Sequence, residues 1–404
     1  MKVASLARRR RLLDIILAVL LLLGMALAAD AQMLEDRQED AGSQEEAGAG
    51  QPPNDGRALR LMVGDQGLAL GHVPRVNGLR VNFSDRGLDR VNGANLTLWR
   101  PEDRVGGDVN GIALGLLAPS ASRIRGLGVS PGAVLAEDDL TGIHAGGLGV
   151  VSGGVARGIL IGGLGAGSSG DVHGVALGGV GAVAGGHLRG IGFGGVGTAT
   201  DGRLDGMGMG TLAVMAAEGI RGIAMGGLAT VSQGPARGIT AGGLAVVADG
   251  AMDGIHVSSL ATVTSGSARG IGVAGLATVA QEGAAGIMAG GISAVSGGHF
   301  RGIGLSGGAV EAFNRLDGTA VAGYRVRART STGVAVAGAR VDVGSHRGLS
   351  AAAYNRASQQ QAGLAVGVYN STDALQGVQL GILNRAGNNR HPFRYLPILN
   401  VNFR

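Results

Sequence analysis

A glycine followed by an aliphatic residue recurs every sixteen residues, without a slip, through the middle of this 404-residue chain. The unbroken run comprises Gly142, Gly158, Gly174, Gly190, Gly206, Gly222, Gly238, Gly254, Gly270, Gly286 and Gly302. Looser copies extend the array over nearly all of residues 76–390. A fixed period of this length is the signature of a repeat architecture, in which each unit buries against its neighbours the surface that it cannot bury alone.

Within each repeat we number positions from this glycine, which is position 0. Aliphatic side chains occupy +1, +3 and +6, as in Ile223, Met225 and Leu228, and a Gly-Gly pair separates +3 from +6. Val, Ile and Thr bounded by Gly, Ser, Asp and Pro favour strands and turns, and several glycines per unit oppose a helix. Because side chains alternate faces along a strand, +1 and +3 share one face and +6 lies on the other. The Gly-Gly pair is then the corner between two short strands.

Two short strands joined by a corner describe one coil of a narrow parallel β-solenoid. We therefore predict an all-β fold, a tandem-repeat parallel β-solenoid with capped ends. Roughly twenty coils spaced at about 4.8 Å would form a rod about 95 Å long. In such a stack the residues at position −1 would lie side by side, where their mostly alternating charges attract each other. This file reads Arg189, Asp205, Arg221, Arg237, Asp253, Arg269, Ala285, Arg301 and Asp317.

An up-and-down outer-membrane β-barrel is the alternative fold, in which each repeat contributes one membrane-crossing strand and one turn. In residues 395–403 apolar or aromatic side chains alternate with mostly polar or smaller ones, much as in the closing strand of such a barrel. This pattern favours the alternative. The aromatic girdles of such barrels are missing, because residues 100–310 contain only two aromatic side chains, Phe193 and Phe300. Aromatic residues gather near the ends, where we expect bulky caps over the solenoid core: Phe83, Trp99, Phe313, Tyr324, Tyr354, Tyr369, Phe393, Tyr395 and Phe403.

The first 57 residues differ from the repeats. Residues 1–28 combine a basic stretch, an apolar run and small residues, which predicts a secretory signal peptide cleaved after Ala28 or Ala31. Residues 29–57 are polar and acidic, which predicts a disordered linker. The glycine-rich repeat domain is then 58–404, with regular units from about 126 to 317 and atypical units on both sides. This order predicts an exported protein at the cell surface, in the outer membrane or in the periplasm.

Charge and cysteine content exclude several kinds of site. Removal of residues 1–28 leaves 29 basic against 28 acidic side chains, which is not the positive balance of a nucleic-acid-binding protein. The chain has no cysteine, which excludes disulfides, thiolate metal sites and a lipid-modified N-terminal cysteine.

Short motifs give no catalytic, cofactor or metal site. The segment Gly190–Gly195 spells the dinucleotide fingerprint but lacks the helix that must follow it. The segment Gly162–Gly167 lacks the Asp of a calcium-binding β-roll. Carboxylates such as those of Asp171, Asp201 and Glu282 lie mainly in predicted turns, as does that of Asp249.

Two further sets of polar residues, the histidines and a file of threonines, are not assigned to a binding or catalytic site. Eight histidines show no metal-ligand spacing, and we interpret them as solvated turn residues: His72, His144, His173, His187, His256, His299, His346 and His391. A file of threonines at +8 could present a plane to ice or to a polymer, although the preference of β-branched residues for strands explains it more simply. The file comprises Thr198, Thr230, Thr262 and Thr278.

The C-terminal segments Gly363–Asn370, Gly377–Asn384 and Pro392–Asn400 resemble the leptospiral-type surface-repeat family. The N-terminal phrases Val76–Asn82 and Val109–Gly115 resemble it too. The resemblance covers most of the chain after the signal peptide and implies a surface or outer-membrane setting, with no catalytic residues. Members are often labelled lipoproteins, whereas this chain has no cysteine to acylate. Its central units also lack the Asn and Gln of the typical repeat.

We therefore expect a non-enzymatic exported surface or envelope repeat protein that acts as a structural spacer or a binding surface, without a cofactor. The expected partner is an envelope or extracellular polymer, and association with the outer membrane is a second expectation. The alternative function is an outer-membrane β-barrel channel or porin-like protein. A polysaccharide-cleaving solenoid enzyme is a third hypothesis, although such enzymes use longer coils and carry acidic clusters on one face.

Overall fold

The structure is a computed structural model that describes residues 58–101 and 105–403. Within these residues it contains thirty-four β-strands and no helix. The predicted signal peptide (1–28) and linker (29–57) lie outside the described residues.

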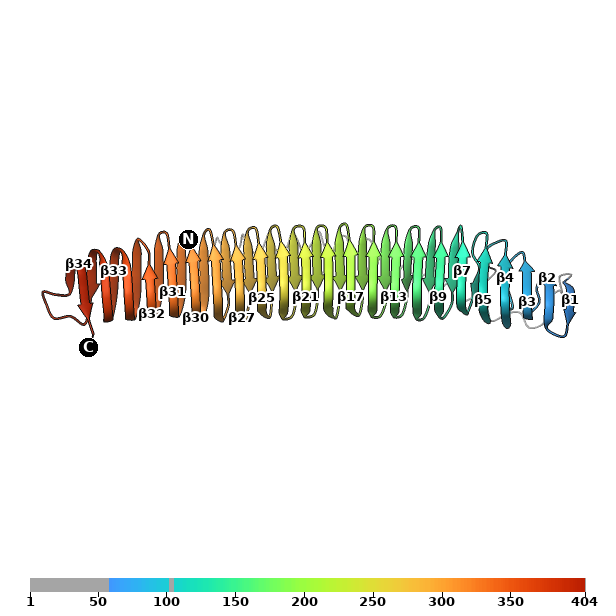
Figure 1. Ribbon diagram of the computed structural model, residues 1–404, viewed down its shortest axis with the longest axis horizontal. Helices are drawn as coiled ribbons and strands as arrows, with labels where there is room; N and C mark the ends of the chain where they lie inside the picture. Colours follow the sequence, from blue (N-terminus) through green and yellow to red (C-terminus); the bar gives the residue numbers. More distant parts are fainter. Residues whose placement is uncertain (1–57, 102–104, 404) are drawn as a thin grey trace, which may run out of the picture. The chain divides into compact units, whose positions relative to one another are not determined.

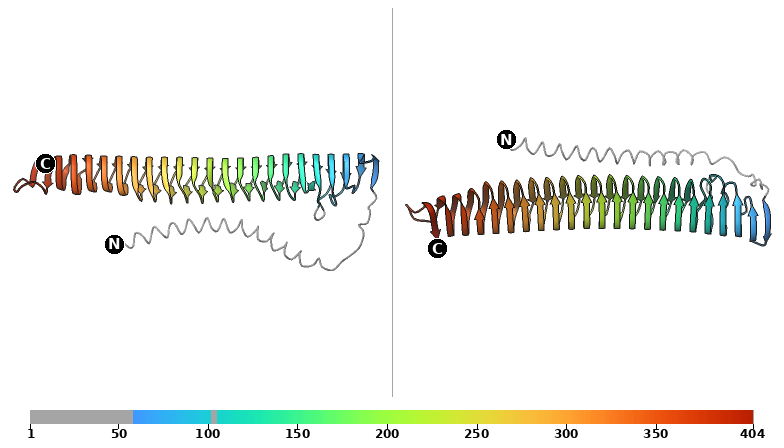
Figure 2. Two further views of the ribbon diagram at one scale, coloured as in Figure 1. Left: turned by 90° about the horizontal axis from the view of Figure 1, so that it is seen from below. Right: turned by 45° about the horizontal axis from the view of Figure 1, so that its top comes forward.

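The strands of the repeat domain stack in parallel along one axis, in about 18 turns (Figures 1 and 2). The strand β15 (Leu188–Gly194) pairs in parallel with β13 (Val172–Gly178) and with β17 (Arg203–Gly210). Each pairing joins residues sixteen apart, as in Gly174 with Gly190. The predicted β-solenoid is therefore confirmed. The barrel alternative is wrong, because an up-and-down barrel needs antiparallel neighbours.

Each regular coil consists of one long and one short strand, which alternate along the chain. The other long strands are β3 (Arg75–Asn82), β4 (Arg90–Thr97), β5 (Asp108–Gly115), β7 (Arg123–Ser130), β9 (Leu140–Gly146), β11 (Ala156–Gly162), β19 (Gly219–Gly226), β21 (Ala236–Gly242), β23 (Met252–Ser258), β25 (Ser267–Ala274), β27 (Gly283–Gly290) and β29 (His299–Ser306). The short strands are β6 (Ser120–Ala121), β8 (Ala133–Ala136), β10 (Gly149–Ser152), β12 (Gly165–Ser168), β14 (Gly181–Ala184), β16 (Gly197–Thr200), β18 (Ala213–Ala216), β20 (Ala229–Ser232), β22 (Ala245–Ala248), β24 (Ala261–Thr264), β26 (Ala277–Ala280) and β28 (Ser293–Ser296).

The two ends of the stack are closed by antiparallel strands. At the N-terminal end β1 (Leu59–Val63) pairs antiparallel with β2 (Gln66–Leu70), and β2 pairs in parallel with β3. At the C-terminal end β34 (Tyr395–Asn402) pairs antiparallel with β33 (Tyr354–Ala386). The strands β30 (Ala309–Ala322), β31 (Arg325–Ala337) and β32 (Arg340–Ala351) connect the regular coils to β33 in parallel register. An added strand covers the open edge of a sheet, which protects the edge from pairing with another chain.

The glycine at position 0 is required by the stacking. Gly190 has a φ of 128°, which L side chains rarely adopt, and a Cβ placed on it would lie 2.0 Å from the carbonyl oxygen of Gly174. The same positive φ and the same close approach to the preceding coil recur along the whole file. The sixteen-residue glycine period is therefore a steric consequence of coil-on-coil contact.

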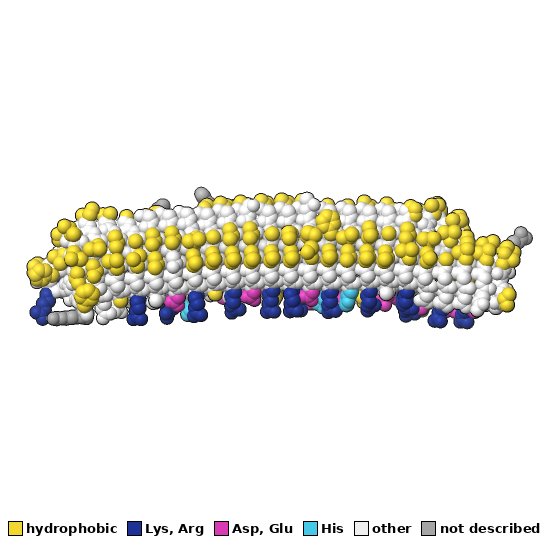
Figure 3. Space-filling model, in the orientation of Figure 1, with side chains coloured by type: hydrophobic (Ala, Val, Ile, Leu, Met, Phe, Trp, Pro, Cys, Tyr) yellow, Lys and Arg dark blue, Asp and Glu magenta, His cyan; other side chains and the backbone are white. Residues whose placement is uncertain are grey.

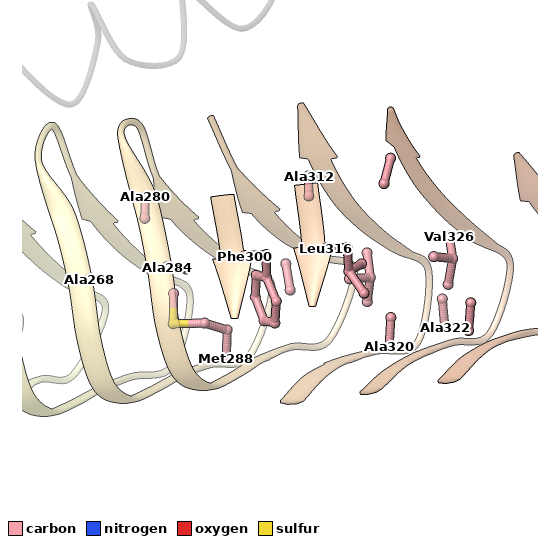
Figure 4. Close-up of a cluster of buried hydrophobic side chains, with 14 of the residues drawn as sticks. Ala268, Ala280, Ala284, Met288, Phe300, Ala312, Leu316, Ala320, Ala322 and Val326 are labelled. Carbon is pink, nitrogen blue, oxygen red and sulfur yellow. The ribbon is translucent and has the colours of Figure 1, made fainter. Parts of the chain in front are cut away.

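The core is narrow and is filled by residues at −2, +2, +8 and +10 of each coil (Figure 4). The side chains at −2 and +2 compensate each other in size. Phe300 fills the coil in which position +2 is Gly304, whereas Ala284 at −2 shares its coil with Met288 at +2. In these two coils a large side chain at one position is matched with a small one at the other, as close packing requires.

The aliphatic residues that mark the repeat lie outside this core. Positions +1 and +3 share one face, as predicted, and that face is the outer one, as in Ile239 and Val257. The chain turns at the Gly-Gly pair, also as predicted. The residue at +6, such as Leu244, stands exposed on the outside of this corner. The expectation that +6 occupies the opposite face of the same strand is therefore wrong, because the strand has already ended there.

Aromatic side chains do not cap the core. Phe83 and Trp99 stack on each other with ring centroids 6.0 Å apart, and both are exposed. Phe313, Tyr324 and Phe403 are exposed as well. The expectation of bulky aromatic caps is wrong, because the backbone of the antiparallel end strands closes the stack.

Polar networks occupy the interior near the N-terminal end. The Arg80 guanidinium is fully buried and donates to Asp85 at 2.9 Å and to Asn95 at 3.0 Å. Asp85 also accepts hydrogen bonds from Asn82 at 2.8 Å and from Thr97 at 2.7 Å. Burial lowers the pKa of Arg80, and the Asp85 carboxylate opposes that shift. This cluster lies in the first coils together with an apolar core that includes Val76 and Val91.

Candidate binding surface

Two files of aliphatic side chains run along the outer face of the long strands (Figure 3). They occupy positions +1 and +3, which alternate with the buried −2, +2 and +4. The exposed members, aliphatic except for Phe193, are Leu127, Val129, Ile143, Ile159, Ile161, Ile191, Phe193, Met225, Ile239, Ile255, Val257, Ile271, Val273, Ile287, Ile303 and Leu305. A continuous exposed apolar surface of this length is unusual for a soluble monomer and is typical of an interaction site.

A third aliphatic file follows the corner at +6, and a fourth follows the short strands at +9. The exposed corner residues are Leu148, Leu164, Val180, Val196, Leu212, Leu228, Leu244, Leu260, Leu276 and Ile292. At +9 Val151 and Val183 are exposed, while Met215 and Val231 are half-buried. We call the outward side chains at +1, +3, +6 and +9 in the coils from Gly126 to Gly286 the apolar band. It covers both faces of the solenoid and the corner between them.

Charged residues are confined to the opposite edge. Every Arg, Asp and Glu from Arg123 to Arg301 lies between +11 of one coil and −1 of the next. We call these turn positions the charged edge; Figure 3 shows its side chains as one row parallel to the aliphatic files. It carries nine arginines and ten carboxylates, so its net charge is close to zero. The solenoid is therefore amphipathic around its perimeter.

The predicted file of alternating charges at −1 is confirmed. The pairing Arg189 with Asp205 continues coil by coil to Asp317. The Asp253 carboxylate lies 3.6 Å from Arg237 and 3.7 Å from Arg269. These groups are solvent-exposed, so each pair contributes at most about 1 kcal/mol. The file matters more as a boundary of the apolar band than as a source of stability.

The predicted turn carboxylates lie on the charged edge. Asp171 accepts a hydrogen bond from the backbone amide of His187 at 2.7 Å and contacts the His173 ring at 3.3 Å. The His187 amide, with a smaller contribution from His173, lowers the pKa of Asp171. The Nδ1 atom of His187 in turn accepts a hydrogen bond from the Arg203 amide at 2.9 Å. These contacts join successive turns, so the Asp171 carboxylate has a structural role.

Three of the eight histidines contradict the expectation of solvated turn residues. His144, His256 and His346 are buried in the solenoid core. Burial lowers the pKa of each of them, to about 4 for His256. His144 and His256 occupy position +2, where the sequence pattern shows mostly small or apolar residues. The interpretation of these three residues as solvated is therefore wrong, because positions −2 and +2 face the core.

The threonine file at +8 also points inward. Thr198 donates to the Met209 carbonyl and Thr230 to the Ala241 carbonyl, each at 2.6 Å. Thr262 and Thr278 are buried as well. These hydroxyls do not form an outer plane for ice or for a polymer.

The two glycine motifs occupy ordinary coil positions. Gly190–Gly195 lies in β15 and the corner after it, and Gly162–Gly167 spans the corner between β11 and β12. A strand and a corner follow the first motif where a dinucleotide site needs a helix. Among residues 58–101 and 105–403 there is no group of three or more His, Asp or Glu side chains arranged to hold a metal ion.

The charge pattern changes in the C-terminal coils. Position +9 there is occupied by Glu311, Arg327 and Asp342, which pair in register, and Asp342 pairs in turn with Arg356. Asp342 lies 3.1 Å from Arg340, and an open hollow of about 400 Å³ lies among these side chains. The apolar band therefore ends before β30.

Comparisons with protein-family models, curated proteins and solved structures found no match. The resemblance to the leptospiral-type surface-repeat family stays a prediction. In the part of the chain that the structure describes, no helix has the length and hydropathy needed to cross a bilayer.

Proposed function

We propose that this chain is a non-enzymatic, exported rod of the cell surface or envelope that acts as a binding surface through its apolar band. The observation that carries the proposal is the exposure of an aliphatic side chain at +6 in every coil from Gly142 to Gly286, together with exposed side chains at +1 and +3 in many of these coils. The N-terminal sequence, typical of a signal peptide, supports export.

Two further observations favour binding over a purely spacing role. A spacer needs length and a soluble surface, and polar residues at +1 and +3 would serve it better. The exposed aliphatic residues instead recur in the same register in every regular coil. Such a surface is unfavourable in water, at about 25 cal/mol per Å² of apolar area, unless a partner covers it.

The proposal that the chain is not an enzyme rests on how its polar side chains are used. The carboxylates of Asp205 and Asp253 face arginines of neighbouring coils. The Asp171 carboxylate is held by a backbone amide. We do not propose the channel alternative, because a channel requires a closed wall and the parallel stack has none.

Partition of the purified full chain between water and a nonionic detergent phase tests the binding surface. We expect the wild-type chain to enter the detergent phase. The triple variant Ile223→Asn, Ile239→Asn, Ile255→Asn removes three outward aliphatic side chains of the +1 file, of which Ile223 is half-buried, and we expect its partition coefficient to fall at least tenfold. Stacked asparagines fit this register, since Asn92 donates to Asn77 at 2.7 Å in the −1 file.

The matched control alters the charged edge in the same three coils, with Arg221→Gln, Arg237→Gln and Asp253→Asn. It should partition like the wild-type chain, and circular dichroism should show the same β signal for all three proteins. A wild-type chain that stays in water as completely as the triple variant would refute the proposed binding surface.

A further inference from the structure

We infer that the apolar band inserts edge-on into one leaflet of a lipid bilayer, with the Gly-Gly corner deepest and the charged edge among the headgroups. This inference rests on the proposed binding surface and names its partner as lipid acyl chains. Four properties of the described residues carry it: the distribution of the apolar files, their depth, the backbone hydrogen bonds of the corner, and the charge of the opposite edge.

The apolar files lie on both faces of the solenoid, and this distribution determines which kind of partner can cover them. Ile223 stands on the long-strand face, Leu228 at the corner and Val231 on the short-strand face of one coil. A second copy or any other flat protein surface would cover one face and leave the other in water. An acyl phase surrounds both faces and the corner at once. Acyl chains are therefore the partner that this distribution fits.

The depth of the band matches one leaflet. From +1 to its end at +4 the long strand advances three residues, which is about 10 Å at about 3.3 Å per residue, and the corner with the +6 side chain lies beyond that end. The hydrocarbon core of a bilayer is about 30 Å thick, so one leaflet offers about 15 Å. The charged residue at −1, such as Arg237, lies two residues beyond +1 and so reaches the headgroup region when the corner lies near the midplane.

The backbone at the corner is hydrogen-bonded from coil to coil. The amide of Gly243 donates to the Gly226 carbonyl at 3.1 Å, and the amide of Leu244 donates to the Leu228 carbonyl at 2.7 Å. The amide of Ala245 donates to the same Leu228 carbonyl at 3.1 Å. An unsatisfied backbone group costs several kcal/mol in hydrocarbon, which excludes most loops from it. The amides of this corner avoid this cost, because each donates to a carbonyl of the turn before it.

The composition of the outward side chains is compatible with hydrocarbon. No Arg, Asp or Glu occurs from +1 to +10 in the coils of the apolar band. The outward hydroxyls there are few, as at Thr211, Ser259 and Ser293. The charges of Arg327 and Asp342 at +9 end the insertion at the C-terminal side, so the inserted length is about eleven coils, or about 53 Å.

The near-zero charge of the charged edge predicts how binding depends on lipid and salt. Nine arginines and ten carboxylates leave no positive excess to attract anionic headgroups. Binding should therefore be driven by apolar burial. It should change less than twofold when anionic phosphatidylglycerol is added to phosphatidylcholine, or when sodium chloride is raised from low to high concentration.

The test uses the absence of cysteine from the chain. Single cysteines are introduced in one coil at the charged edge (Arg221→Cys), on the long-strand face (Ile223→Cys), at the corner (Leu228→Cys) and on the short-strand face (Val231→Cys). Each variant of the full chain is labelled with a polarity-sensitive dye and mixed with phosphatidylcholine vesicles. Quenchers fixed at the headgroup or deep in the acyl chain then report depth.

We expect the chain to float with the vesicles. The deep quencher should act most strongly on the label at 228, strongly on those at 223 and 231, and at least fivefold more weakly on that at 221. The variant Leu228→Asn, Leu244→Asn, Leu260→Asn should float at least tenfold less, while Arg221→Gln, Arg237→Gln should float normally. Since Leu228→Cys changes only one residue of the corner, the depth profile stays informative if the triple variant is unstable.

The outcomes separate this inference from the proposed function. A chain that enters detergent but does not float with vesicles keeps its apolar binding surface and refutes insertion. Flotation that requires phosphatidylglycerol and is lost in high salt also refutes it. A dye that is shielded from water at position 223 but not at position 231 points instead to a second copy of the chain and overturns the lipid assignment. Shielding of either dye in the absence of vesicles has the same meaning. A chain that neither floats nor enters detergent refutes both proposals.

Discussion

The hydroxyl oxygen of Thr240 lies 2.6 Å from Nδ1 of His256, which occupies the same position in the next coil. Both side chains are buried. The imidazole is therefore held in an interior that disfavours its charged form, and burial lowers the pKa of His256 to about 4.

Acid should destabilise the solenoid through this histidine. The unfolded chain, with a His pKa near 6.5, binds a proton that the folded chain does not bind until about pH 4. The stability contributed by the neutral ring is full above pH 6.5 and is lost as the pH falls from about 6.5 to about 4. The full loss is about 3 kcal/mol, since one pKa unit corresponds to about 1.4 kcal/mol.

Thermal unfolding of the wild-type chain and of His256→Leu at pH 7.5 and pH 4.5 measures this contribution. The wild-type chain should lose more stability between the two pH values than the variant, because the variant has no ring to protonate. Equal losses in the two proteins would show that other groups, such as His144 and His346, account for the acid sensitivity.

Substitution of a position-0 glycine should disrupt the stack. A Cβ in Gly190→Ala would lie 2.0 Å from the Gly174 carbonyl oxygen, at a φ of 128°. We expect a loss of at least about 3 kcal/mol, the range of severe backbone strain and overpacking. Gly181→Ala is the control, because no atom lies within 3.8 Å of its added Cβ. Urea unfolding should show a change below about 1 kcal/mol for this control.

The core should accept an exchange of volume within one coil. Leu188 fills the space beside Gly192, where an added Cβ would lie 2.7 Å from Leu188 Cδ1. Leu188→Ala should cost about 2 to 5 kcal/mol by leaving a cavity, and Gly192→Met should cost about 1 to 3 kcal/mol by overpacking. The double variant copies the arrangement of Ala284 and Met288 and should recover most of both losses. A double-mutant cycle with strictly additive losses would contradict this compensation.

The polar cluster of the N-terminal coils should depend on both partners of its ion pair. Asp85→Ala leaves the buried Arg80 charge without its carboxylate, and breaking a buried pair costs about 3 to 5 kcal/mol. Because neighbouring repeats unfold partly independently, amide hydrogen exchange should locate the loss in β3 to β5. The double variant Arg80→Leu, Asp85→Leu removes both charges and should protect these strands better than Asp85→Ala does.

The period and the corner follow from spacing, since Gly190 and Gly206 are sixteen apart. The opposite charges of Arg189 and Asp205 favour close parallel neighbours, but the antiparallel barrel stayed open until the strand pairing excluded it. The hydrophobicity of the residues did not predict which face of each long strand points inward. The interior holds small side chains at +8 and +10 and larger ones at −2 or +2, such as Leu188, so the aliphatic residues at +1 and +3 face outward.

The apolar band was missed because aliphatic residues in a strand are ordinarily assigned to the core. The signal that reveals it is the exclusion of charge from +1 to +10, together with the confinement of residues such as Asp201 and Glu282 to the turns. The buried histidines could be placed only once −2 and +2 were known to face inward. The polar cluster around Asp85 depends on a loop outside the regular period and carries no repeating signal.

The sixteen-residue register has an evolutionary consequence. Since every regular coil meets its neighbours through the same Gly-to-Gly contact, an in-frame duplication or deletion of one repeat preserves both ends and the backbone register of the stack. Each event changes the length of the rod by about 4.8 Å. Gain or loss of whole repeats can therefore change the length of the rod in equal steps.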